Sequence, residues 1–137
     1  MSAIITAAIT TPPVAADVVI DTAAPDHARR FGGLERLYGV AGAAHIRHAH
    51  VLVVGIGGVG SWAVEALARS GVGRLTLVDL DHVSESNINR QIHALDATVG
   101  QAKVEAMRDR IAQINPDCRV LAVDEFVEPG NWTGVLE

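Results

Sequence analysis

The chain has 137 residues, so it forms one ordinary domain at most, and its 49% hydrophobic and 20% charged residues are typical of an α/β globular protein. A net charge of −5 and a pI near 5.6 exclude nonspecific attraction to nucleic acids or membranes through overall charge, but not a local basic patch. Because Cys118 is the single cysteine, an intrachain disulfide and a zinc site of several cysteines are excluded. A chain without disulfides is typical of the cytoplasm, and we expect the protein to act there.

The first 27 residues are rich in Ala, Thr and Pro and predict a poorly ordered N-terminal tail. No basic residue precedes Arg29, and Pro12 and Pro13 interrupt the apolar run, so a secretory signal is disfavoured. No segment reaches the ~18 consecutive apolar residues of a membrane helix, and we therefore expect no membrane partner.

Strands and helices alternate along the rest of the chain. The hydrophobic pattern predicts helices over residues 34–48, 59–70 and 100–114, strands over 49–54, 74–79 and 119–124, and a loop or broken helix over 81–99. In the second helix, Val59, Ala63, Ala66 and Leu67 are expected to face the sheet. Residues 129–131 resemble the start of another helix.

This alternation implies a parallel sheet with right-handed crossovers. The predicted fold class is therefore α/β, a Rossmann-like doubly wound parallel sheet. Three strands are few for such a sheet, because both of its faces need cover. We interpret the chain as the N-terminal half only, either a fragment or a chain that needs a partner to cover its edge.

Four glycines, Gly55, Gly57, Gly58 and Gly60, follow the first predicted strand and open the next helix. Glycine permits a tight turn and a close backbone approach to phosphates, and a helix start offers free N–H groups to an anion. Asp79 lies at the end of the second strand, 19 positions after Gly60, where an acid commonly holds ribose hydroxyls. The pattern predicts a nucleotide site.

A polar cluster after the second strand distinguishes between nucleotides. Ser86, Asn87, Asn89 and Arg90 offer amide and guanidinium donors that suit a triphosphate, whereas hydride transfer by an NAD enzyme has no need of them. Lys103 lies in the first turn of a predicted helix, where its charge opposes the helix dipole. A bound anion would remove that conflict.

Two further sets of residues fit more than one interpretation. Asp81 could orient Arg90, cap the next turn or have no role. Of these interpretations we favour a structural role. His45, His48 and His50 lie around the start of the first strand with no acid or cysteine beside them, so no metal site is predicted there.

The residues from VLVVGIGGVG at 51–60 to Pro116 resemble the ubiquitin-activating-like adenylating enzymes of the ThiF, MoeB and HesA type. The segments RRFGGLERLYG at 29–39, VVGIGGVGSWAVEALARSGVG at 53–73 and NRQIHAL at 89–95 are most similar to the branch of tRNA threonylcarbamoyladenosine dehydratases. The resemblance covers roughly residues 28–128.

The resemblance implies an enzyme that uses ATP to adenylate a carboxylate, here to dehydrate N6-threonylcarbamoyladenosine at tRNA position 37 to its cyclic form. It implies that Gly58 and its neighbours approach the phosphates, that Asp79 binds the ribose, and that Ser86 through Arg90 line the nucleotide. Asn87, Asn89 and Arg90 would lie near the triphosphate, and Lys103 would contact phosphate. Arg90 and Lys103 are the implied catalytic residues.

The resemblance also implies partners and limits. Residues 28–137 would be an ATP-binding domain truncated at its C-terminus, with the Mg²⁺ ligand beyond residue 137, and the full-length protein would be a homodimer that binds tRNA. One alternative is adenylation of the C-terminus of a ubiquitin-like sulfur-carrier protein. Another is a nonproductive nucleotide-binding fragment.

Overall fold

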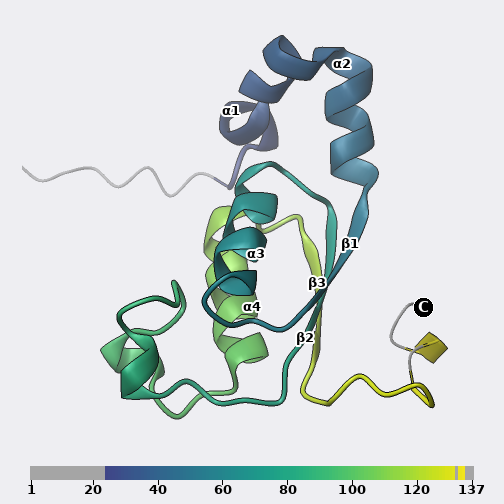
Figure 1. Ribbon diagram of the computed structural model, residues 1–137. Coiled ribbons are helices and arrows are strands. Elements are labelled where there is room, and N and C mark those ends of the chain that lie inside the picture. Colours follow the sequence, from purple (N-terminus) through teal and green to yellow (C-terminus); the bar gives the residue numbers. More distant parts are fainter. Residues whose placement is uncertain (1–23, 132, 135–137) are drawn as a thin grey trace, which may run out of the picture.

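The computed structural model describes residues 24–131, 133 and 134. The predicted tail, residues 1–27, lies largely outside these residues, as does most of the helix expected after residue 131. The elements in chain order are α1 His27–Phe31, α2 Gly33–His48, β1 His50–Val54, α3 Gly60–Arg69, β2 Arg74–Val78, the 3₁₀ turns η1 Glu85–Asn87 and η2 Asp96–Thr98, α4 Lys103–Ile114 and β3 Arg119–Val123. Figure 1 shows their arrangement.

The two N-terminal helices precede the sheet. The side chain of Asp26 caps α1 by accepting hydrogen bonds from the backbone N–H groups of Ala28 and Arg29. Helix α2 covers the predicted residues, but it is interrupted at Gly39, whose φ of 72° is open to glycine at little cost. The predicted single helix is thus two helical segments joined at that glycine.

Within the described residues, the sheet has three parallel strands in the order β1-β2-β3. Val51 pairs with Leu75, and Leu75 pairs with Val120, so β2 is the central strand. The predicted α/β parallel sheet is confirmed. Val54 and Leu121 lie on the face away from α3 and α4 and are 52% and 45% exposed, whereas Thr76 and Val78 of the central strand are buried.

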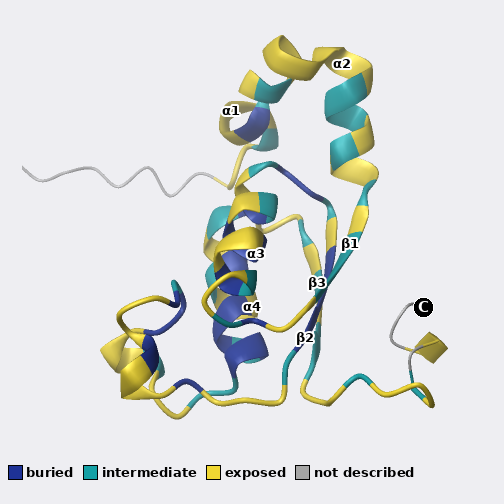
Figure 2. Ribbon diagram, in the orientation of Figure 1, coloured by how far each residue is buried: buried dark blue, intermediate teal, exposed yellow. Residues whose placement is uncertain are grey.

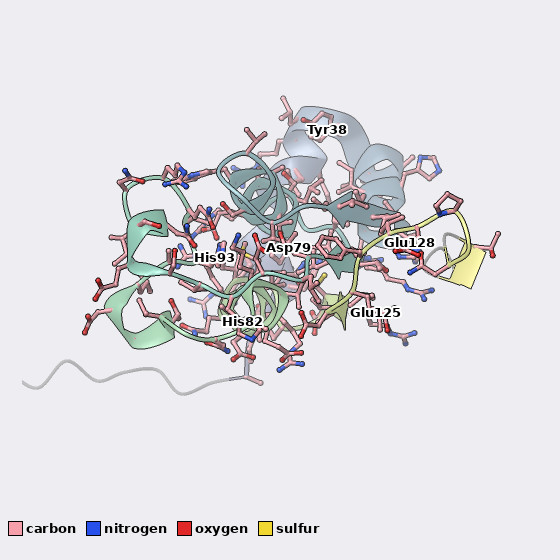
Figure 3. The ribbon with its side chains drawn as sticks, turned by 60° about the horizontal axis from the view of Figure 1, so that its bottom comes forward. Tyr38, Asp79, His82, His93, Glu125 and Glu128 are labelled. Carbon is pink, nitrogen blue, oxygen red and sulfur yellow. The ribbon has the colours of Figure 1, made fainter. Side chains whose placement is uncertain are left out.

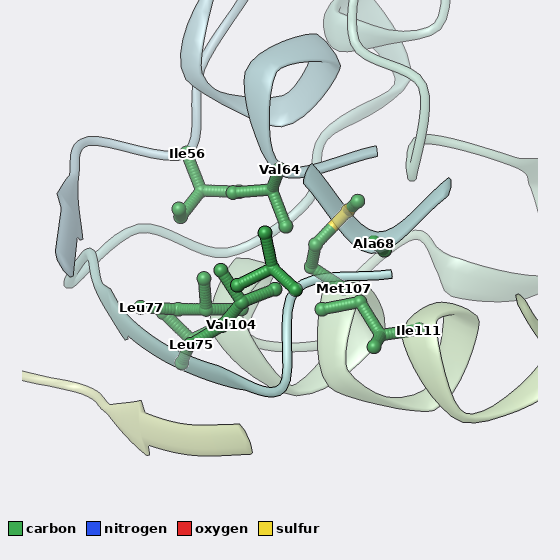
Figure 4. Close-up of a cluster of buried hydrophobic side chains, with 9 residues drawn as sticks. Ile56, Val64, Ala68, Leu75, Leu77, Val104, Met107 and Ile111 are labelled. Atoms are coloured by element: carbon green, nitrogen blue, oxygen red, sulfur yellow. The ribbon is translucent and has the colours of Figure 1, made fainter. Parts of the chain in front are cut away.

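The core lies between the sheet and the helices α3 and α4, which pack side by side on one face (Figure 1). Its buried members come from both helices, from β2 and from the loops that follow β1 and α3. They are Ile56, Val64, Ala68, Val72, Leu75, Leu77, Val104, Met107 and Ile111, most of which Figure 4 labels. Burial of this apolar surface is the main stabilising contribution to the fold.

The predicted inward face of α3 is wrong for Val59, Ala63 and Ala66, which are exposed, and right for Leu67, which packs against the core. Val59 is 85% exposed, and the buried positions of the helix are Ser61, Val64, Glu65 and Ala68. The rotation of the helix is set at its first residue, because a Cβ at Gly60 would lie 1.8 Å from the carbonyl oxygen of Gly55. Positions four and eight residues after Gly60 share its face and therefore point into the core.

The segment between β2 and α4 is a loop with two 3₁₀ turns, as the expectation of a broken helix implied. Helix α4 begins at Lys103, three residues later than predicted, because Gly100 has a φ of 89° and leaves the helical region. Figure 2 shows β2 and the inner side of α4 buried and the turns largely exposed. None of the helices among the described residues has the length and apolar character needed to cross a membrane.

Candidate nucleotide-binding site

The glycine loop joins β1 to α3 and leaves backbone donors open. Gly55 has a φ of 88°, and its N–H donates to the carbonyl of Val78 and so extends the pairing of β1 with β2. Helix α3 then begins without a side-chain cap. Among the described residues, no acceptor binds the N–H groups of Gly57, Gly58 and Val59. Such groups at a helix start attract an anion.

Asp79 ties the loop after β2 to the glycine loop. Its Oδ2 accepts a hydrogen bond from the backbone N–H of Ile56 at 2.6 Å, and its Oδ1 accepts one from the N–H of Asp81 at 2.8 Å. A carboxylate offers about four lone-pair positions, so both oxygens retain capacity for hydroxyl donors. Asp79 is therefore placed where the sequence predicted the ribose acid, and it also shapes the loop.

A cavity of about 210 Å³ opens beside Asp79 at the ends of β1 and β2. Apolar side chains form much of its wall, including Val54, Phe126 and Val127, and Phe126 is 67% exposed. In Figure 3, which views this end of the sheet, Asp79 lies between His93 and Glu125. An apolar wall next to a carboxylate is suited to a base joined to a sugar.

Arg90 follows the η1 turn in the chain, and its side chain lies beside the glycine loop. A Cβ built on Gly58 would lie 3.7 Å from the Cδ and Cγ of Arg90, so the arginine stem lies next to that glycine. Its Nη1 donates to the carbonyl of Ser86 at 2.7 Å and to Oδ1 of Asn89 at 3.0 Å. The indole N–H of Trp62 on α3 donates to the carbonyl of Arg90 at 2.9 Å and fixes the segment against that helix.

Asn87 has a structural function in this geometry. It is buried, and its Oδ1 accepts a hydrogen bond from the N–H of Ser84 at 3.0 Å, which closes a capping box around η1. Ser86 is exposed, and its hydroxyl lies 2.9 Å from that of Ser84. The structure therefore brings Arg90 to the glycine loop, binds Asn89 to its guanidinium, and uses Asn87 to build the turn that carries both residues.

Lys103 and Asp81 form an ion pair at the start of α4. The Nζ of Lys103 lies 2.8 Å from Oδ2 of Asp81, and the N–H of Lys103 donates to the carbonyl of Asp81 at 2.9 Å. The lysine side chain is only 7% exposed. The expected conflict between Lys103 and the helix dipole is thus relieved by an acid of the chain itself, and Asp81 pairs with Lys103, not with Arg90.

His93 is a buried residue for which the sequence indicated no role. It is 1% exposed, and neither ring nitrogen has a hydrogen-bond partner among the described residues. Burial, and next the positive charge of Lys103, lower the pKa of His93 to about 4. Its ring is therefore neutral at neutral pH. Trp62 was also missed, because an aromatic residue in a helix gives no sign that it binds a distant loop.

No cluster of three or more metal-binding side chains occurs in the described part of the chain. Two of the histidines contact other groups of the chain: a ring nitrogen of His48 lies 2.7 Å from the carbonyl oxygen of Ala44, and one of His50, at the start of β1, lies 2.8 Å from the hydroxyl of Thr76. Burial raises the pKa of the Cys118 thiol to about 11, so the reactive thiolate form is disfavoured.

A parallel sheet, a glycine loop with open N–H groups, an acid at the next strand end and an adjacent arginine define a Rossmann-like nucleotide-binding domain. The model of the ThiF family matches residues 28–137. The chain therefore belongs to the ThiF family, and the resemblance inferred from the motifs is confirmed.

Several curated proteins of known name are similar to this chain in sequence. The chain is 60% identical over 103 residues to the tRNA threonylcarbamoyladenosine dehydratase of Escherichia coli K12, which covers 75% of this chain and 38% of that protein. The Haemophilus influenzae protein of the same name is 50% identical and covers 81% and 42%. The molybdopterin-synthase adenylyltransferase of Salmonella typhimurium is 47% identical over 91 residues and covers 66% and 36%. The chain spans less than half the length of these relatives.

Solved structures agree with the fold. The E. coli tRNA N6-threonylcarbamoyladenosine dehydratase in complex with ATP has a TM-score of 0.77 and 57% identity, and the match covers 80% of this chain and 45% of that one. The same enzyme in complex with AMP matches equally well. The Rossmann-like fold is therefore shown, together with its extent of about half of the neighbouring chain.

Proposed function

We propose that the protein binds ATP and uses it to activate a carboxylate by adenylation, and that this carboxylate belongs to N6-threonylcarbamoyladenosine in tRNA. The observation that carries the proposal is the approach of Arg90 to the open N–H groups of the glycine loop. The 60% identity to a tRNA threonylcarbamoyladenosine dehydratase, against 47% for a molybdopterin-synthase adenylyltransferase, favours the tRNA substrate.

The site residues divide the work of binding the nucleotide. The N–H groups of the glycine loop bind phosphate oxygens, and Asp79 accepts hydrogen bonds from the ribose hydroxyls. The guanidinium of Arg90 stabilises negative charge that develops on the phosphates, and Asn89 orients it. Lys103 adds a second positive charge, held in place by Asp81.

The reaction then follows from the chemistry of ATP. A carboxylate oxygen of the substrate attacks the α-phosphorus, the bond to pyrophosphate breaks, and an acyl-adenylate forms. The substrate's own carbamoyl nitrogen attacks the acyl carbon and loses its proton, and AMP leaves. The sum is the removal of one water from the nucleoside and the cleavage of ATP to AMP and pyrophosphate.

Further elements of the proposal concern the surroundings of the site. We include Mg²⁺ as the metal that accompanies the triphosphate, a homodimer as the assembly and the cytoplasm as the location. Asp79, Asp81 and Glu125 line the cavity beside the glycine loop, and the first two carboxylates already bind groups of the chain. In line with the family resemblance, we expect the principal Mg²⁺ ligand to lie beyond residue 137.

The test is a reaction with the substrate itself. The protein is incubated with ATP, Mg²⁺ and tRNA that carries N6-threonylcarbamoyladenosine, and the digested nucleosides are analysed by mass spectrometry. We expect a nucleoside lighter by one water, together with equal amounts of AMP and pyrophosphate. Substrate that stays unchanged, while a carrier peptide ending in Gly-Gly drives pyrophosphate release, would overturn the tRNA assignment in favour of a sulfur carrier.

The nucleotide is tested separately by titration. We expect ATP to bind more tightly than NAD, because Arg90 and the open N–H groups favour a triphosphate. Tighter binding of NAD would contradict the ATP site.

A further inference from the structure

A second cavity, of about 510 Å³, lies where α1 meets the C-terminal ends of α3 and α4. In Figure 1 this region is at the opposite end of α3 from the glycine loop. The lining residues are Arg30, Phe31, Arg69, Arg110, Gln113 and Ile114. Three arginines thus face one cavity in a chain whose net charge is −5.

The arginines are held by a buried carboxylate. Glu65 on α3 is 5% exposed, and its two oxygens accept hydrogen bonds from Nε and Nη2 of Arg110, at 2.6 and 3.2 Å, and from Nε of Arg69 at 2.7 Å. Burial raises the pKa of Glu65, but the hydrogen bonds from Arg110 and Arg69 outweigh it and the pKa is lowered. The carboxylate is therefore ionised and orients both guanidinium groups.

The third arginine comes from α1. The Nη1 of Arg30 donates to the carbonyl oxygens of Gln113 and Ile114, at 3.2 and 2.8 Å, at the end of α4. This places a positive charge at the negative end of the helix dipole. The charges of Arg30, Arg69 and Arg110 exceed that of Glu65 by two, so the cavity is positively charged.

Donor groups remain after these contacts. A guanidinium carries five N–H donors, and Arg69 uses only its Nε on Glu65. In the described residues its two terminal nitrogens make no hydrogen bond, and its side chain is 60% exposed. Because the guanidinium fork matches the oxygens of phosphate, this set is suited to a phosphate group.

We propose that Arg30, Arg69 and Arg110 form a phosphate-binding site separate from the glycine loop, and that it binds a backbone phosphate of RNA. The RNA assignment rests on the proposed tRNA substrate. Arg69 lies nine positions after Gly60 on α3, which corresponds to about 14 Å along the helix, so one RNA molecule is large enough to occupy both sites. Phosphate contacts of this kind position a nucleic acid without reading its sequence.

The test compares Arg69→Gln with Arg108→Gln. Both substitutions remove one arginine charge, and Glu65 keeps its contact with Arg110 in the first variant. Arg108 is a matched control because it lies two positions before Arg110 on α4, about 200° around the helix, where it pairs with Glu105 and Asp109. Thermal denaturation of both variants checks that they are folded.

Affinity for unmodified tRNA transcript is measured without ATP by fluorescence anisotropy at several salt concentrations. We expect Arg69→Gln to weaken binding by about tenfold and to reduce the salt slope by about 1. We expect Arg108→Gln to bind like the wild type. Equal affinity and equal slopes in both variants would overturn the RNA contact.

A second arm uses inorganic phosphate and distinguishes the source of the anion. In one outcome, phosphate raises the melting temperature of the wild type and of Arg108→Gln but not that of Arg69→Gln, and all three proteins bind RNA with the same affinity. The site then binds free phosphate, and the RNA assignment is wrong. Because neither arm requires turnover, a failure of the dehydration reaction leaves this test intact. Likewise, normal dehydration activity would not support the RNA contact if Arg69→Gln bound RNA like the wild type.

Discussion

The Nζ of Lys103 lies 2.8 Å from Oδ2 of Asp81, and this pair joins the first residue of α4 to the loop after β2. The lysine is 7% exposed and the aspartate 70%, so the buried partner is the cation. Removing only the aspartate would leave a largely buried positive charge at the positive end of a helix dipole.

We therefore predict that Asp81→Asn lowers the free energy of unfolding by about 1–3 kcal/mol. This loss lies between the losses typical of exposed and of buried ion pairs, because only the lysine of this pair is buried. In a double-mutant cycle with Lys103→Met, measured by urea denaturation, the coupling should be at least about 1 kcal/mol. The exposed pair of Arg108 with Glu105 is the control, and its coupling should stay below about 0.5 kcal/mol. Equal coupling in the two pairs would contradict the role assigned to burial.

Asp79→Asn should weaken ATP binding, because the proposed ribose bond and the observed bond to the N–H of Ile56 lose a charged acceptor. A hydrogen bond to a charged group contributes about 1.5–3 kcal/mol, which corresponds to at least a tenfold loss of affinity by isothermal titration. Asp117→Asn, an exposed acid before β3, is the matched control and should bind ATP normally. Unchanged affinity in folded Asp79→Asn would exclude the ribose role.

Arg90→Gln should reduce the rate of ATP–pyrophosphate exchange by about 10²–10³, the usual loss when a donor to developing charge is removed. Its ATP affinity should change less, because the N–H groups of the glycine loop still bind the phosphates. Arg119→Gln, an exposed arginine at the start of β3, controls for the change in charge. Near-normal exchange by Arg90→Gln would refute a catalytic role.

The stability of the protein should depend on pH through His93. Its pKa is lowered from 6.5 to about 4 in the folded protein, so the unfolded chain binds a proton first as the pH falls. The contribution of His93 is complete above pH 6.5 and is lost toward pH 4, with a slope of at most about 1.4 kcal/mol per pH unit.

The measurement is the free energy of unfolding of the wild type minus that of His93→Leu, taken as a function of pH. Glu65 has a pKa lowered from 4.5, so its own contribution is lost only below pH 4.5, and the range from pH 4.5 to 6.5 isolates His93. His45 is exposed, so the variant His45→Gln is the control, and its free energy of unfolding should depend on pH as that of the wild type does. A difference that does not vary with pH would show that folding does not lower the pKa of His93.

The strands and the order of elements were predictable because each one depends on a local pattern. The apolar runs before Gly55 and Asp79 form β1 and β2, and the spacing of Val104, Met107 and Ile111 indicated the inner face of α4. The inner face of α3 was not predictable in this way. Its rotation depends on the close approach of Gly60 to the carbonyl of Gly55, and the sequence pattern does not contain that contact.

The residue pattern by itself determined the class of fold, the position of the glycine loop and the acid at the end of β2, because strand–turn–helix geometry is local and glycine is needed where backbone must come close. Which charges pair depends instead on the tertiary structure. Asp81 pairs with Lys103 across 22 positions, and Glu65 with Arg110 across 45. Such pairs form when packing brings distant segments together, and their partners therefore depend on the whole fold rather than on the residues around them.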